Sequence, residues 1–107
     1  MIRQFDTDIA RKCGLNAAVV ADFLWERVKT DEDYRVEYGR EWTRVSQKMM
    51  SADIPCLTVD MIANAVKRLK DKGYIKVSRF NDSKFDHTNW YAFTDYGLEA
   101  MLKEEAA

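Results

Sequence analysis

The chain of 107 residues is 47% hydrophobic and 33% charged, and its net charge at pH 7 is −1. With four glycines, one proline and two cysteines, the composition excludes a collagen-like repeat, a disordered tail and a disulfide scaffold. No apolar run approaches the roughly 18 residues that cross a bilayer, and the N-terminus holds no hydrophobic signal core. We therefore expect one cytoplasmic domain over residues 1–107, with reduced cysteines and no membrane partner.

Charge is distributed unevenly along the chain. Residues 58–79 hold six basic residues against two acidic ones, a local net charge of +4. Much of the opposing charge lies in the consecutive acids at 31–33 and in the last part of the chain, after residue 94. The near-neutral total argues against a protein whose whole surface attracts phosphate, and the segregation predicts one basic face on an acidic body.

The first predicted elements are two helices and a strand. A short helical turn over residues 8–13 stops at Gly14, because glycine readily adopts the left-handed conformation that ends a helix. Apolar residues spaced four apart predict an amphipathic helix over residues 15–28. We expect the polar stretch 30–40 to be a loop and residues 41–45 to form a short β-strand.

Two further helices follow, joined by a turn. Ser46 is placed to cap a helix over residues 47–52, and Pro55 forbids its continuation. Thr58 can cap the next helix, which Gly73 ends. The predicted buried stripe of that helix consists of Ile62, Ala65, Val66 and Leu69.

The last part of the chain predicts a β-hairpin and a helix. Residues 74–80 and 90–94 are rich in β-branched and aromatic side chains, and the polar run 81–89 separates them. They should pair as a hairpin with a long tip. Thr94 can then cap a final helix over residues 96–104.

The order of these elements predicts the fold class. Two helices joined by a short turn and followed at once by a β-hairpin are typical of a winged helix-turn-helix. We therefore expect an α+β domain with a three-helix core, a β-hairpin wing and an extra C-terminal helix.

Five short motifs occur along the chain in this order: Gly14-Leu15-Asn16-Ala17-Ala18, Trp42 with Ser46 four residues later, Ile54-Pro55-Cys56-Leu57-Thr58, Leu69-Lys70-Asp71-Lys72-Gly73-Tyr74-Ile75 and Asn89-Trp90-Tyr91. Together they resemble the N-terminal winged-helix domain of prophage and plasmid replisome-organiser (replication initiation) proteins. The match covers about residues 14–97. The resemblance implies a winged helix that binds double-stranded DNA at a replication origin or operator, with replication proteins as further partners.

The chain departs from this family in its recognition helix. Met61 and Asn64 stand where the family commonly has Thr and a basic residue, and Ala63 replaces a frequent Lys or Arg. These changes reduce the number of expected DNA contacts. Family members usually continue into a linker and an assembly domain, so we expect residues 1–107 to be either an excised domain or a stand-alone relative.

The helix that begins after Thr58 is the expected DNA-recognition element. Asn64 can pair with adenine through two hydrogen bonds, and Lys67 and Arg68 can reach guanine edges or phosphates. Thr58 and the neighbouring amides form a helix N-terminus that suits a phosphate. Asp60 either interacts with the helix dipole or accepts a hydrogen bond from cytosine.

The flanking elements supply the other expected contacts. The wing can follow the DNA backbone or the minor groove, and the start of the preceding helix can sit on flanking phosphates. About five cationic contacts would give a log–log salt slope on the order of −4 to −5. The predicted DNA-binding residues are Arg44, Lys48, Thr58, Asp60, Asn64, Lys67, Arg68, Lys70, Arg79, Lys84 and His87.

Other interpretations remain open from the sequence. Basic residues near a helix C-terminus also favour the helix dipole, so Lys67, Arg68, Lys70 and Lys72 can form an ordinary solvated face. The single histidine and the cysteine spacing predict no metal or cofactor, and no Gly-rich phosphate loop or Ser/His/Asp set supports an enzyme. The alternatives to replication are a transcriptional regulator, acting as a homodimer at an operator, and a protein-interaction winged helix without DNA binding.

Overall fold

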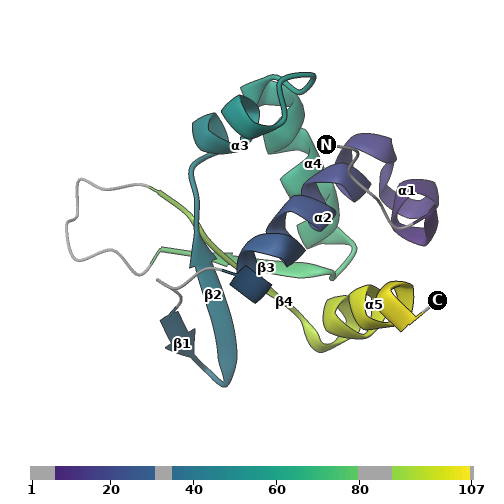
Figure 1. Cartoon of the computed structure of the whole chain (residues 1–107), viewed down its shortest axis with the longest axis vertical. Coiled ribbons are helices and arrows are strands. Elements are labelled where there is room, and N and C mark those ends of the chain that lie inside the picture. The colour runs from purple at the N-terminus through teal and green to yellow at the C-terminus, as the bar shows by residue number, and fades with distance from the viewer. Residues whose placement is uncertain (1–6, 31–34, 80–87, 107) are drawn as a thin grey trace.

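The structure, a computed structural model, describes residues 7–30, 35–79 and 88–106 (Figure 1). In these ranges the chain forms five helices and one four-stranded antiparallel sheet, a small α+β domain. The helices are α1 Thr7–Cys13, α2 Leu15–Thr30, α3 Gln47–Asp53, α4 Val59–Asp71 and α5 Asp95–Ala106, and the strands are β1 Arg35–Glu37, β2 Arg40–Arg44, β3 Ile75–Ser78 and β4 Trp90–Phe93. No helix in the described ranges combines the length and hydropathy that a membrane span requires.

The helical core centres on α2 and α4, which pack against each other. The predicted stripe of α4 is buried as expected, with Ile62 and Leu69 fully inaccessible. Thr58 caps α4 by accepting a hydrogen bond from the Met61 amide (3.2 Å). Gly73 follows the helix with a φ of 81°, so both predicted ends of α4 are confirmed.

The strands are arranged in the order β1-β2-β4-β3. The predicted hairpin is confirmed, because β3 and β4 pair antiparallel with Val77 opposite Tyr91. β2 pairs with the other edge of β4, placing Thr43 opposite Tyr91. Tyr91 and Thr43 are fully buried toward the helices, so this row of the sheet forms the floor of the core.

The prediction of a loop over residues 30–40 is wrong at both ends, because Thr30 is the last residue of α2 and a β-hairpin begins at Arg35. β1 occupies Arg35–Glu37 and pairs with β2 through a two-residue turn at Tyr38 and Gly39. Both turn residues have positive φ, 54° and 72°, as a tight hairpin turn of primed type requires. The strand is short and polar, and Arg35 and Glu37 form an ion pair (2.9 Å) instead of contributing to an apolar face. Figure 1 shows this hairpin projecting away from the helices.

An arginine joins the helical core to the sheet. Arg27 of α2 donates to the Thr43 hydroxyl (3.3 Å) and to the Arg44 carbonyl (3.0 Å) at the end of β2. Ser46, two residues further on, caps α3 by accepting from the Met49 amide (3.0 Å), as predicted. The side chain from α2 thus holds the point at which the sheet passes into the helix pair.

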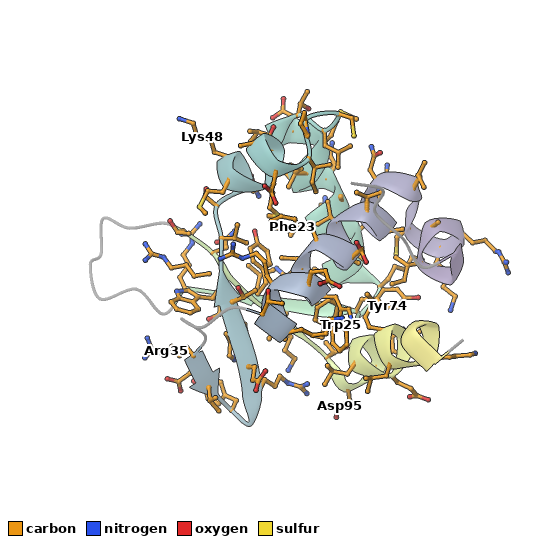
Figure 2. The ribbon with its side chains drawn as sticks, viewed as in Figure 1. Phe23, Trp25, Arg35, Lys48, Tyr74 and Asp95 are labelled. Atoms are coloured by element: carbon orange, nitrogen blue, oxygen red, sulfur yellow. The ribbon has the colours of Figure 1, made fainter. Side chains whose placement is uncertain are left out.

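Helix α5 is attached at its first turn. The Thr94 hydroxyl accepts from the Gly97 amide (3.0 Å), which confirms the predicted cap, and also donates to the Gly73 carbonyl. Gly97 lies against the backbone of Tyr74, so closely that a Cβ on Gly97 would be 2.0 Å from the Tyr74 carbonyl oxygen. Figure 2 shows Tyr74 beside α5, with Trp25 nearby. Trp25 packs edge-on against Phe93, with ring centroids 5.5 Å apart.

Candidate nucleic-acid interface

The outward face of α4 carries one row of polar side chains. Asp60, Asn64, Lys67 and Asp71 are all exposed and lie three or four residues apart, opposite the buried stripe. We call these four residues the outer row of α4. It contains one cation, one amide and two carboxylates, of which the carboxylate of Asp71 was not among the predicted contacts. The outer row therefore offers hydrogen-bonding groups for bases but little positive charge of its own.

Arg68 points toward the N-terminal helices. Its guanidinium donates to the Cys13 carbonyl at the end of α1 (3.4 Å), and the terminal nitrogen would lie 3.0 Å from a Cβ on Gly14. Arg68 remains exposed, yet this contact directs its charge away from the outer row of α4. Lys70 does not share this environment: it lines a groove together with residues of β3. Three neighbouring cations that the sequence placed on one surface thus have three different surroundings.

The junction between β2 and α3 brings together a second group of predicted residues. Arg44 is exposed at the end of β2, and Lys48 is exposed in the first turn of α3, where Figure 2 shows it extending away from the molecule. A hollow of about 510 Å³ lies beside them, lined by Arg27, Arg44, Ser46, Met49 and Trp90 among others. Among the described residues, its wall includes two arginines and no carboxylate, so this part of the surface suits an anion such as a phosphate.

The predicted wing contacts lie only in part within the described residues. Arg79 is exposed after β3, and its guanidinium donates to the side-chain oxygen of Asn89 (3.3 Å). Asn89 in turn donates to the hydroxyl of Tyr91 (3.3 Å). Burial raises the pKa of the Tyr91 hydroxyl, and its hydrogen bonds to Asn89 and Gln47 oppose that rise. Lys84 and His87 fall outside the described residues.

Sequence reasoning missed one basic surface. A groove of about 510 Å³ on the sheet is lined by Tyr38, Arg40, Trp42, Lys70 and Lys76, with parts of β3 and Thr94. It exists only because the β1–β2 hairpin, β3 and the end of α4 meet in space. The sequence signal that could have indicated this groove is Tyr38 followed by Gly39, an aromatic residue in a turn.

The two cysteines are free, and they differ in accessibility. Burial raises the pKa of the Cys13 thiol, although the positive charges of Lys72, Lys12 and Arg68 lower it in part. Cys56 is exposed in the turn between α3 and α4. Within the described ranges, no three His, Cys, Asp or Glu side chains are grouped closely enough to hold a metal ion.

This difference predicts the reaction of the native protein with a thiol reagent such as DTNB. We expect Cys56 to react rapidly at neutral pH and Cys13 to react only after unfolding, because the reactive thiolate must be both formed and accessible. Absorbance would then report about one fast thiol per chain, and Cys56→Ser should remove the fast phase. Two fast thiols in the folded protein would contradict the burial of Cys13.

No protein-family model, curated protein or solved structure matches this chain. The resemblance to replisome-organiser domains therefore stays a prediction from the sequence motifs.

Proposed function

We propose that this protein is a winged helix that binds double-stranded DNA with sequence selectivity, in the initiation of replication of a phage or other mobile element. The observation that carries the proposal is the position of α4. This helix buries its apolar stripe against the core and leaves Asn64 and Lys67 exposed in its outer row, with α3 before it and the β3–β4 hairpin after it. That is the arrangement in which a recognition helix enters the major groove.

The sheet supports the same interpretation. Leaving β1 aside, the sequence α2, β2, α3, α4, β3, β4 and the strand order β2-β4-β3 correspond to the three helices and three strands of a winged helix. β1 extends the sheet beyond this pattern. The replication role rests on the motif resemblance, and the DNA-binding role rests also on this geometry.

The surface chemistry suggests that base recognition and phosphate binding are carried out by two different groups of residues. In the outer row of α4, Asn64 can read an adenine edge, whereas Asp60 and Asp71 repel nearby phosphates. Backbone contacts must then come mainly from cations on either side, Arg44 and Lys48 before α4 and Arg79 after it. We infer a protein whose affinity depends on the flanking cations and whose selectivity depends on α4.

A fluorescence-anisotropy titration of a labelled duplex between 50 and 200 mM salt tests the proposal. Four cationic contacts, from Arg44, Lys48, Lys67 and Arg79, predict a log–log slope of about −3 to −4. Asn64→Ala should mainly reduce discrimination between a selected site and random duplex, by about 1–3 kcal/mol. As a control, Lys103→Ala on α5 should change neither quantity. Absence of salt-sensitive duplex binding at tens of micromolar protein would overturn the proposal.

The exposed apolar side chains favour a second candidate, a protein-interaction module. Met49 of α3 is 53% exposed and Val59 of α4 is 42% exposed. If these two side chains dock a partner protein, Met49→Ser and Val59→Ser should weaken that complex and leave duplex binding intact. A loss of duplex affinity in the same variants would assign these side chains to the DNA surface instead, for example to contact with thymine methyl groups.

A further inference from the structure

The groove on the sheet is lined by none of the four residues of the outer row of α4, although it reaches Lys70 at the end of that helix. Lys76 of β3 is paired with Ala92 of β4, and Trp42 of β2 lies next to Ala92 on the other side, because its neighbour Thr43 pairs with Tyr91. Since side chains alternate along a strand, Trp42, Ala92 and Lys76 share the face opposite to the core row of Tyr91. Trp42 and Lys76 of this face, together with Tyr38, Lys70 and residues of β3, line a groove of about 510 Å³.

The charge in this groove has one sign. Arg40, Lys70 and Lys76 line it from β2, α4 and β3, and none of the described residues that line it carries a carboxylate. Arg40 is partly neutralised by its ion pair with Asp95 (3.1 Å), which is not a lining residue of the groove. In the described part of the chain, no carboxylate lies within ion-pair distance of Lys70 or Lys76. The groove is therefore complementary to an anion that spans from the end of α4 to β3.

An aromatic ring is held at the rim of the groove. Tyr38 is 85% exposed and has a φ of 54°, a left-handed conformation that is costly for a bulky side chain. The hairpin that presents it is fixed by the indole N–H of Trp42, which donates to the Glu37 carbonyl (3.0 Å). Trp42 itself is only 4% exposed and forms part of the wall. The fold thus places an exposed aromatic ring and two lysines on the lining of one groove, and the ring's residue adopts a costly left-handed backbone conformation.

We propose that this groove binds single-stranded nucleic acid. Tyr38 stacks on one base, and Lys70 and Lys76 bind the phosphates next to it. A duplex does not fit this chemistry, because its base faces are already stacked on one another and are not available to a tyrosine ring. An acidic peptide would satisfy the lysines and leave the ring unused. The site goes beyond the proposed duplex binding and shares no residue with the outer row of α4.

Anisotropy of a labelled dT12 oligonucleotide, measured with the full chain, tests this site. Tyr38→Gly should weaken binding about 5- to 150-fold, as expected for one stacked base, and should leave the fold intact because glycine accepts the positive φ. Tyr38→Phe should retain the affinity, since the ring is kept. Lys76→Ala should reduce the log–log salt slope by about 0.7, as expected for one phosphate contact to a single strand.

Lys67→Ala on the outer row of α4 is the matched control. We expect it to leave dT12 affinity unchanged and to reduce duplex affinity. The groove proposal is overturned if Tyr38→Gly and Lys76→Ala bind dT12 as the parent chain does, if only Lys67→Ala weakens dT12 binding, or if polyglutamate competes as well as unlabelled dT12. Binding of dT12 that depends on Tyr38, without any duplex binding, would sustain this site and overturn the function proposed for α4.

Discussion

The double charge reversal Lys48→Glu with Lys67→Glu is expected to lower duplex affinity by at least about 30-fold. One of these lysines is exposed on α3 and the other in the outer row of α4, so the pair tests both sides of the proposed interface. If each loss costs about 1–3 kcal/mol, the two together correspond to this factor or more. Competition anisotropy at fixed salt measures it, and circular dichroism checks that the helical content is kept.

Arg68 would be a poor choice for this experiment, although the sequence places it next to Lys67. Its contact with the Cys13 carbonyl joins α4 to the end of α1, so charge reversal there would disturb packing as well as any DNA contact. Lys103→Glu, an exposed site on α5, gives the same change in charge per substitution and should leave affinity within about twofold, since surface charges remote from an interface act weakly through salt. The double variant changes the net charge by −4 and the control by −2, so a control that loses half as much binding free energy as the double variant would mean that only net charge matters.

Gly97→Ala is expected to destabilise the domain by at least about 3 kcal/mol, a large case of overpacking. The new methyl group would meet backbone, at 2.0 Å from the Tyr74 carbonyl oxygen and 2.9 Å from its carbon. Neither atom can move without shifting the start of β3 or detaching α5. Chemical denaturation followed by tryptophan fluorescence measures the free energy of unfolding.

Gly39→Ala provides the comparison for this prediction. A Cβ on residue 39 would meet no atom within 4 Å, but the alanine would have to adopt the φ of 72° that Gly39 has in this turn. We expect a cost of about 1–2 kcal/mol, from the left-handed backbone alone. If Gly97→Ala costs no more than Gly39→Ala, the close approach of α5 to Tyr74 is not part of the folded state in solution.

Local patterns in the sequence were sufficient for most of the fold. The apolar spacing in α4, the caps at Ser46 and Thr58, and the aromatic strands of the hairpin each depend on residues within one element, and all are confirmed. β1 was missed because its three residues have no apolar alternation and its turn begins with tyrosine instead of the usual asparagine or glycine. Pairing with β2 stabilises it, and that is a tertiary effect.

The candidate site was less accessible to prediction. Helical spacing correctly separates the outer row of α4 from its buried stripe, but it cannot tell where long side chains turn at the ends of the exposed face. Arg68 and Lys70 are two residues apart and reach different elements, one at α1 and the other beside β3. The groove beside Tyr38 combines residues that are far apart in the chain, so no local sequence pattern predicts it.

The arginine between α2 and the sheet bears on the thermodynamics of recognition. Thr43, which accepts one of the hydrogen bonds of Arg27, is fully buried, so the hydroxyl end of this bond is shielded from competing water while Arg27 is partly exposed. The second bond, to the Arg44 carbonyl, fastens the last residue of β2 just before α3 begins. These two bonds tie the junction before α3 to α2 in the free protein, so we expect a partner that docks on α3 and α4 to find this junction pre-organised and to pay less conformational entropy on association.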